Sequence, residues 1–435
     1  MKRIGFKTLG CRVNLYETDA LASRFKAEGY EVVSGDSEAD VVVVNTCTVT
    51  NTSDQKCRQA IHQIRRKNPE ALIVVTGCMV NHRKEDLIQE DIADYVIDNE
   101  RKAAIFDIVD EHFKKGHSDP EGYDRDLFSY QPAFDTFHTR SLIKIHDGCN
   151  NFCSYCIIPM VRGRSTSRPA NDIYENIQKV VDHGFKEIVL TGVNMGRYHD
   201  GETDFETLVE HIINIKGDFR VRVSSIEPDQ FSDRFLQLFQ HEKLAPHMHI
   251  CLQSGSEDTL KRMHRFYTAA QYREMVERIK TFRPDFNLTT DIIVGFPGET
   301  DQTFQESCDF AREMGFSHIH TFKYSKRTGT KAAMIPNQVP ETVKTKRSEV
   351  MRSISLENKR QYFERMRGKN QRLLIERIDT KGVAHGYGEN YIPILTPGEG
   401  LEKNSFIDVT LNEIINPNNE DKMAFDGLLH CPSSQ

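Results

Sequence analysis

The sequence lacks the features that mark membrane, secreted and strongly basic proteins. No apolar run approaches the length needed to cross a bilayer, which argues against a membrane protein. The first residues, MKRIGFK, lead into a strand-like segment without the apolar stretch and cleavage site of a signal peptide, so we expect a cytoplasmic protein. The net charge is -7, so any contact with nucleic acid must come from local basic patches.

Length and cysteine content narrow the class further. At 435 residues the chain is too long for one ordinary domain, and 38% apolar with 28% charged residues fits two or three globular ones. Ten cysteines in a reducing compartment are better interpreted as metal ligands or catalytic groups than as disulfides. Their spacing is therefore the main guide to function.

The N-terminal part alternates short strands with amphipathic helices. This pattern is typical of a parallel sheet covered on both faces, so we expect a doubly wound α/β domain over residues 1–120. The predicted strands are 4–9, 31–33, 41–44, 72–75 and 95–97, and the predicted helices are 15–28 and 53–67. Residues 116–139 have no clean period and contain His, Asp, Gly and Pro, which is typical of a linker.

Two further units are expected after the linker. A second alternating series predicts a partial (β/α)6 barrel over residues 136–366, with active groups at the carboxyl ends of its strands. Its predicted strands are 142–145, 187–190, 220–224, 247–252, 288–294 and 318–324. Shorter strands at 372–376, 383–387, 391–395 and 406–411 predict a small antiparallel β-barrel over residues 367–432. The helix expected at 341–367 is densely basic, but such a run is usually just a solvated face.

Three cysteines lie on one short loop after the first predicted barrel strand. Cys149, Cys153 and Cys156, here called the barrel set, form a C-x3-C-x2-C pattern. Three thiolates can hold three irons of a [4Fe–4S] cluster and leave the fourth iron open. A structural zinc site is the alternative, but such sites close with four ligands and no nearby fourth cysteine or paired histidine is evident. His146 lies close by, in the strand register, and we expect it to be a core or supporting residue.

A second set of three cysteines is spread over the N-terminal domain. Cys11, Cys47 and Cys78, here called the N-terminal set, follow the first, third and fourth predicted strands. Parallel strands end at one edge of a sheet, so these thiols should converge and hold a second cluster. The other four cysteines lack such placement, and we expect packing or surface roles for Cys57, Cys251, Cys308 and Cys431.

The order of these units and motifs resembles the radical S-adenosylmethionine (SAM) methylthiotransferases over essentially the whole chain. The resemblance implies two [4Fe–4S] clusters, one binding SAM and one auxiliary for sulfur, and a C-terminal TRAM-like RNA-binding barrel. It also implies that SAM is cleaved to a 5′-deoxyadenosyl radical, while the protein binds, orients and excludes water. By resemblance, residues at the strand ends cradle SAM: Tyr155, Gly192, Asn194, Glu227, Gln253, Ser254 and Asp291.

Three branches of the family use different substrates. TLGCRVNLYET from Thr8 and RGRSTSR from Arg162 look like the branch that acts on N6-threonylcarbamoyladenosine at position 37 of tRNA. The alternatives are isopentenyladenosine in tRNA and an aspartate of a ribosomal protein. Arg162, Arg164 and Arg168 suit an anionic substrate, because a carboxylate accepts bidentate arginine hydrogen bonds.

The resemblance implies as partners the anticodon stem-loop of tRNA and an external electron donor, with a sulfur donor that the sequence does not identify. Tyr387 and Tyr391, amid basic residues of the C-terminal strands, could stack on bases, although barrel tyrosines are as often core. A non-enzymatic RNA-binding module is a third hypothesis. The barrel of such a module would not need the SAM-facing residues that this sequence has at the ends of four strands, which argues against this hypothesis.

Overall fold

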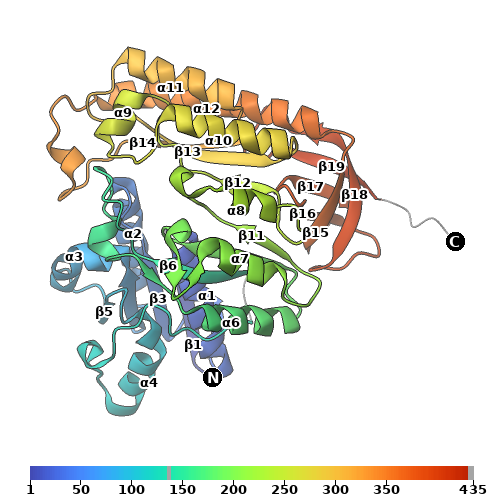
Figure 1. Cartoon of the computed structure of the whole chain (residues 1–435). Coiled ribbons are helices and arrows are strands. Elements are labelled where there is room, and N and C mark those ends of the chain that lie inside the picture. The colour runs from blue at the N-terminus through green and yellow to red at the C-terminus, as the bar shows by residue number, and fades with distance from the viewer. Residues whose placement is uncertain (135–138, 430–435) are drawn as a thin grey trace.

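The computed structural model describes residues 1–134 and 139–429, and it contains three units that follow one another along the chain (Figure 1). An N-terminal parallel sheet is followed by a larger central unit of strands and helices. A closed β-barrel ends the chain. Within the described ranges no helix is long and apolar enough to cross a membrane.

The N-terminal unit is a five-stranded parallel sheet with helices on both faces, as the sequence predicts. Alternate residues of β3 face two separate apolar clusters, Val41 and Val43 on one side and Val42 and Val44 on the other, so the strand is buried on both faces. Helices α1 and α4 cover the first side, and α2 and α3 cover the second. The order is β2-β1-β3-β4-β5. The elements are β1 (Arg3–Thr8), α1 (Arg12–Ala27), β2 (Glu31–Ser34), β3 (Val41–Thr46), α2 (Asn51–Lys67), β4 (Leu72–Gly77), α3 (Cys78–Gln89), β5 (Tyr95–Ile97) and α4 (Ile105–Lys115).

The central unit is an open arrangement of parallel strands, which confirms the predicted partial barrel. Strands β6 (Arg140–Asp147), β8 (Glu187–Gly192) and β11 (Arg220–Val223) form one half, and β12 (His247–His249), β13 (Asn287–Val294) and β14 (His318–Lys323) form the other. Isolated parallel bridges, Val221 to Leu244 and Ile226 to Ile250, join the halves. The covering helices are α6 (Ala170–Asp182), α7 (Phe205–Ile213), α8 (Asp233–Leu238), α9 (Glu257–Arg262), α10 (Ala269–Phe282) and α11 (Asp301–Met314).

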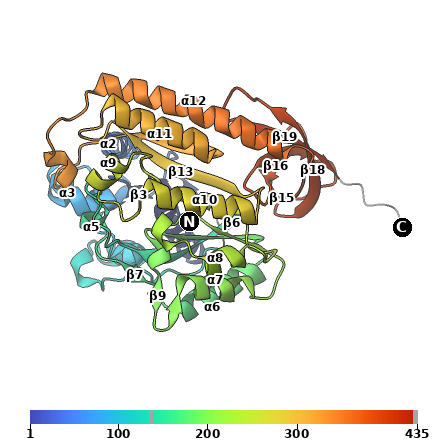
Figure 2. The ribbon, with the colours of Figure 1, turned by 45° about the horizontal axis from the view of Figure 1, so that its top comes forward.

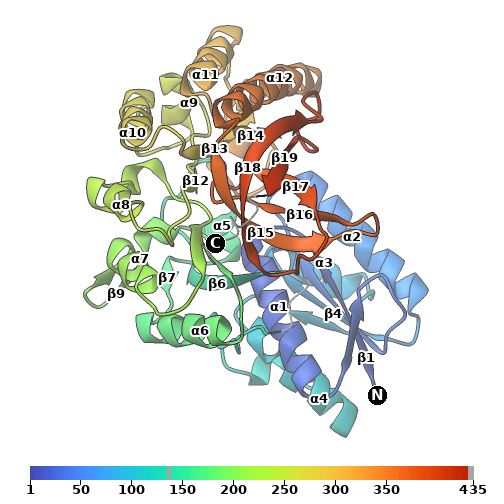
Figure 3. The same ribbon diagram turned by 90° about the vertical axis from the view of Figure 1, so that its right-hand side faces the viewer.

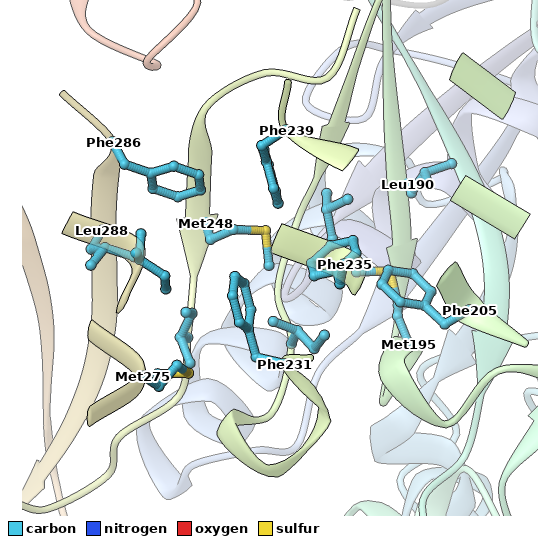
Figure 4. Close-up of a cluster of buried hydrophobic side chains, with 14 of the residues drawn as sticks. Leu190, Met195, Phe205, Phe231, Phe235, Phe239, Met248, Met275, Phe286 and Leu288 are labelled. Atoms are coloured by element: carbon cyan, nitrogen blue, oxygen red, sulfur yellow. The ribbon is translucent and has the colours of Figure 1, made fainter. Parts of the chain in front are cut away.

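Aromatic and sulfur-containing side chains fill the space between these strands and helices. Figure 4 shows Phe231, Phe235 and Phe239 beside Met248, with Phe286 on the opposite side. The rings of Phe235 and Phe239 meet edge to face at 5.3 Å, and those of Phe239 and Phe286 at 4.9 Å. This core fixes the strand ends on which the candidate site is built.

The long helix α12 (Glu341–Met366) links the central unit to the C-terminal barrel and lies beside α11 (Figure 2). Its face is less solvated than the sequence suggests, because Lys344 and Arg347 are buried and Arg347 pairs with Glu299 at 2.8 Å. The closed barrel has the order β15-β16-β17-β19-β18. Its strands are β15 (Asn370–Ile378), β16 (Val383–Tyr387), β17 (Pro393–Pro397), β18 (Phe406–Ile415) and β19 (Ala424–Leu429), the last of which the sequence analysis missed.

Of the two roles considered for Tyr387 and Tyr391, stacking on bases or packing in the core, the structure favours packing, because both lie where the C-terminal barrel meets the central unit. The rings of Tyr387 and Tyr391 stack on each other at 4.6 Å, and the guanidinium of Arg140 lies over both. Arg140 Nη1 also donates to the Tyr391 hydroxyl at 2.8 Å. The guanidinium of Arg222 lies 4.5 Å from the centroid of the Tyr391 ring. These rings therefore serve the interface between the units.

Candidate functional site: two cysteine sets joined by a buried charge network

The barrel set lies on a loop that leaves the carboxyl end of β6. Gly148 opens this loop with φ +66°, and a Cβ there would lie 2.0 Å from the Arg164 carbonyl oxygen, so only glycine fits. The Cys149 amide donates to the Gly163 carbonyl at 3.2 Å, and the Ser154 amide donates to the Met263 carbonyl at 3.0 Å. The loop is thereby held at both ends.

Two side chains donate hydrogen bonds to sulfurs of the barrel set. Arg265 Nη1 lies 3.1 Å from Cys153 Sγ, and Asn194 Nδ2 lies 3.4 Å from Cys149 Sγ. Burial raises the pKa of Cys156 to about 12, so a thiolate there requires a strong compensating charge such as a metal. All three cysteines are free thiols. The donor set therefore fits an iron–sulfur cluster.

The residues expected to cradle SAM lie at the ends of successive strands. Gly192 ends β8, and Asn194 follows it. Glu227 follows β11 and forms an ion pair with Arg265, while burial raises its pKa. Asp291 lies on β13, 3.2 Å from Nε2 of His249. The backbone N–H of Asn194 donates to Nδ1 of His146. His146 is buried and supports these strand ends, as expected.

Three of the predicted cradle residues are partly engaged within the protein. Gln253 has φ +67° and keeps its backbone in a bridge to Ile292. The Ser254 hydroxyl lies 3.0 Å from that of Ser307, so it positions the loop after β12. Tyr155 packs its ring edge to face against Phe296 at 6.4 Å.

The N-terminal set gathers at the carboxyl edge of the first sheet. Cys11 and Cys47 follow β1 and β3, which flank the point where the strand order reverses, and ligands bind at such points in α/β sheets. A Cβ on Gly10 would lie 2.7 Å from Cys47 Cβ and 3.0 Å from Cys47 Sγ, so these two loops are in close contact. Burial, together with the nearby Cys78 and Cys11 thiols, raises the pKa of Cys47 to about 11.

Cys78 receives hydrogen bonds from both the N-terminal and the central unit. Arg162 Nε lies 3.2 Å from Cys78 Sγ, and Asn99 Nδ2 lies 3.8 Å from it. Cys57 holds the backbone of the N-terminal set in place, because its Sγ donates to the Cys47 carbonyl at 3.3 Å. Cys57 and Cys308 are buried packing residues as expected, whereas Cys251 faces His249 and Asp291 and Cys431 lies outside the described residues.

A buried network of charges joins the two cysteine sets. Lys144 on β6 lies 2.9 Å from Glu17 on α1 and 2.6 Å from Asp147, and Lys102 also contacts Glu17. Arg162 completes the network, 2.8 Å from Asp147 and 3.2 Å from Glu17. Burial alone would raise the pKa of Glu17, but Lys102, Arg162 and Lys144 hold it well below its usual range.

The balance of this network fits an anionic group beside it. Two carboxylates, Glu17 and Asp147, face three cations, Lys102, Lys144 and Arg162, which leaves an excess of one positive charge in the interior. Buried charge is costly unless it is compensated. Thiolates of the N-terminal set would supply that compensation, and Cys78 is in direct contact with Arg162. Sequence reasoning missed this network because its members are far apart along the chain.

The expectation that Arg162 and Arg168 are available to an anionic substrate is wrong. Both side chains are buried, and Arg162 is committed to Cys78, Asp147 and Glu17. Arg168 donates to the Tyr16 hydroxyl at 3.4 Å. Arg164 remains exposed, with its guanidinium over the ring of Phe152.

The chain is similar to known proteins over most of its length. The pattern of the Radical SAM superfamily matches residues 143–311, and that of the uncharacterized protein family UPF0004 matches residues 3–98. The chain is 37% identical over 412 residues to the threonylcarbamoyladenosine tRNA methylthiotransferase MtaB of Bacillus subtilis, covering 92% of this chain and 91% of that protein. It is 33% identical over 390 residues to the tRNA-2-methylthio-N(6)-dimethylallyladenosine synthase of Syntrophus aciditrophicus, covering 86% and 84%.

A solved structure shares the fold. The radical S-adenosylmethionine methyltransferase TsrM from Kitasatospora setae matches with a TM-score of 0.55 at 14% identity, covering 77% of each chain. The superfamily match assigns the cofactors SAM and [4Fe–4S] clusters. With the coverage and identity of its relatives, this chain is a transferase and belongs to the family of radical SAM tRNA methylthiotransferases.

Proposed function

We propose that this enzyme places a methylthio group on C2 of N6-threonylcarbamoyladenosine at position 37 of tRNA, in the cytoplasm. The observation that carries the methylthiotransferase chemistry is the presence of two three-cysteine sets, each with an arginine at hydrogen-bond distance from one sulfur. One set lies in the radical SAM match and the other in a separate sheet. Separate sites suit a reaction that needs both a radical and a sulfur atom.

The barrel set, Cys149, Cys153 and Cys156, would hold the SAM-binding cluster. When bound there, that cluster supplies the electron that cleaves SAM to methionine and a 5′-deoxyadenosyl radical. The protein's part is to orient SAM and exclude water. Asn194 and Arg265 orient the cysteine loop through their sulfur contacts, and Arg265 fixes Glu227 beside it. The SAM-contacting residues we propose are Tyr155, Gly192, Asn194, Glu227, Gln253, Ser254 and Asp291.

The N-terminal set, Cys11, Cys47 and Cys78, would hold the auxiliary cluster. When bound there, that cluster supplies the site of sulfur chemistry. Arg162 and Asn99 stabilise the Cys78 thiolate, and the charge network keeps α1 against β6 of the central unit (Figure 3). These contacts between the two units support the proposal that the two sets act together.

The substrate branch is proposed from the names of the relatives. Four relatives named for threonylcarbamoyladenosine are 36–37% identical to this chain. Those named for dimethylallyladenosine are 31–34% identical. An unpaired base in the anticodon loop is also cheaper to bring into a pocket than a base in a duplex. An external electron donor and a sulfur donor complete the proposed partners.

A competition assay tests this function. Anaerobically reconstituted enzyme, SAM and reductant are given equal amounts of anticodon stem-loops with each modified adenosine and of the ribosomal protein, and products are measured by mass spectrometry. We expect methylthiolation of threonylcarbamoyladenosine to dominate. A preference for isopentenyladenosine or for the protein aspartate would overturn the branch assignment and leave the radical chemistry intact.

A further inference from the structure

Arg12 is an exposed cation directly after Cys11, and it is the first residue of α1. Across residues 1–134 and 139–429, its side chain has no hydrogen bond, ion pair or aromatic contact. Three other arginines near the cysteine sets are hydrogen-bonded or ion-paired: Arg162 with Cys78, Arg265 with Glu227 and Arg168 with Tyr16. Arg164 lies over the ring of Phe152. An unengaged guanidinium at this place is available to a ligand.

The surroundings of Arg12 show that it stands where all three units meet. Helix α1 packs against β1 of its own sheet and against β6 and β8 of the central unit (Figure 3). Burial lowers the pKa of His247 on β12, and the charges of Arg222 and Arg12 lower it further. Burial raises the pKa of Tyr391 in the C-terminal barrel, but Arg140 and Arg12 bring it below its ordinary value. The charge of Arg12 therefore acts on a residue of the central unit and on a residue of the C-terminal barrel.

The charges around this point leave Arg12 as the cation that an incoming anion meets. Asp291 is paired with His249, and Glu227 is paired with Arg265, so neither carboxylate neutralises it. Burial and the neighbouring His318 and His249 lower the pKa of His320 to about 4, so that imidazole is neutral at pH 7. His247 is buried and its Nδ1 has no partner among the described residues.

The chemistry of the substrate fits this position. In adenine, C6 and C2 are both bonded to N1, so the N6 substituent and the atom that receives sulfur flank N1 on the same edge of the ring. A residue that holds the N6 substituent must therefore lie close to the sulfur-bearing set, and Arg12 is covalently next to Cys11. A threonylcarbamoyl group carries a carboxylate that suits bidentate arginine binding, whereas an isopentenyl group offers only apolar surface.

We propose that Arg12 binds the carboxylate of the threonylcarbamoyl group and is the residue that selects this modified adenosine. The inference rests on the proposed function, because it specifies how that substrate is recognised. Arg12 acts on binding and orientation, and takes no part in bond making. The selected chemical class is an N6-substituted adenosine with a negative charge on its substituent.

The test compares two anticodon stem-loops that differ only in charge. One carries threonylcarbamoyladenosine, and the other carries its carboxamide analogue. We expect the wild-type enzyme to prefer the carboxylate in kcat/KM and in RNA affinity by about 10- to 100-fold, as for a hydrogen bond to a charged group. Arg12→Gln should reduce this ratio to about one, and Arg12→Lys, which keeps the charge but loses the bidentate geometry, should retain part of it.

Two variants and one extra measurement make the result decisive. Arg164→Gln removes the one exposed arginine among Arg162, Arg164 and Arg168, and Arg377→Gln removes an exposed charge of the C-terminal barrel. Both variants should leave the preference for the carboxylate over the carboxamide unchanged. RNA affinity, measured by fluorescence anisotropy, reports on recognition even if Arg12→Gln lowers the iron content. Loss of discrimination in Arg164→Gln but not in Arg12→Gln overturns the inference. A wild-type enzyme that does not favour threonylcarbamoyladenosine over isopentenyladenosine overturns the proposed function as well.

Discussion

Arg162 Nε lies 3.2 Å from Cys78 Sγ, while Nη1 of the same guanidinium lies 2.8 Å from Asp147, two residues before Cys149. One side chain thus contacts a ligand of the N-terminal set and the strand that carries the barrel set. A hydrogen bond to a cluster ligand stabilises the more negative, reduced form. We therefore propose that Arg162 would be a positioning residue for the auxiliary cluster.

Arg162→Lys keeps the positive charge but loses the Nε hydrogen bond to Cys78. We expect the reduction potential of the auxiliary cluster to fall by about 60 mV, which is a tenfold change for a one-electron couple. An EPR-monitored redox titration measures it. Arg164→Lys changes an exposed arginine whose guanidinium lies over the ring of Phe152, so the potential in this variant should equal that of the wild type. Equal potentials in both variants would contradict the role of Arg162.

The two cysteine sets predict about eight irons per chain after anaerobic reconstitution, because each set supports a four-iron cluster. Replacing Cys149, Cys153 and Cys156 together by Ala should remove about half of this iron and abolish 5′-deoxyadenosine formation. Iron analysis and product detection measure both effects. One equivalent of zinc without iron–sulfur absorption would reject this reading of the barrel set.

Replacing Cys11, Cys47 and Cys78 together by Ala should separate radical formation from sulfur insertion. The barrel set belongs to another unit, so 5′-deoxyadenosine should still form from SAM, while methylthiolated RNA should be absent. Liquid chromatography with mass spectrometry detects both products. An unchanged yield of methylthiolated RNA would show that sulfur is transferred elsewhere.

Gly10→Ala should prevent assembly of the auxiliary cluster. Its new Cβ would lie 2.7 Å from Cys47 Cβ, and its φ of +108° disfavours any side chain. We expect the iron content to fall to about four per chain. Gly29→Ala is the matched control, since Gly29 also has a positive φ, +85°, but nothing lies within 4 Å of its added Cβ. It should lose about 1 kcal/mol of stability and keep its iron.

Asp19 should make stability fall as pH rises. Both of its carboxylate oxygens are buried without a partner among the described residues, and burial raises its pKa to about 7. Folding therefore promotes protonation of this carboxyl. It does not lower the free energy of unfolding below about pH 4, and it lowers that free energy progressively more between about pH 4 and about pH 7. At pH 8, Asp19→Asn should raise the free energy of unfolding by up to about 4 kcal/mol.

Urea denaturation at pH 5 and pH 8 measures this effect. The gain in Asp19→Asn should be clearly smaller at pH 5. Asp36→Asn, at an exposed carboxyl that pairs with Lys7, should change stability by less than about 0.5 kcal/mol at either pH. A pH-independent gain in Asp19→Asn would mean that the carboxyl is not protonated on folding.

Several features could be predicted because they depend on neighbours in the sequence. The run of valines at 41–44 indicates a strand buried on both faces, and β3 is such a strand. Cys149, Cys153 and Cys156 share one loop, so their spacing alone indicates a common metal site. The N-terminal set was also predictable, because strand ends of a parallel sheet share an edge wherever the helices lie.

Other features depended on how the units pack against one another. Arg162 looked like a substrate-binding residue, but it pairs with Glu17 and Cys78 from another unit, and no local pattern indicates partners so distant in sequence. Tyr387 and Tyr391 looked free to stack on bases, but Arg140 covers them at the unit boundary. The sequence by itself determined most of the strands, the cysteine loops and the family. Only the tertiary structure decided which charged side chains are neutralised inside the protein, and that Arg12 has no partner among the described residues, because desolvation and ion pairing depend on contacts between distant segments.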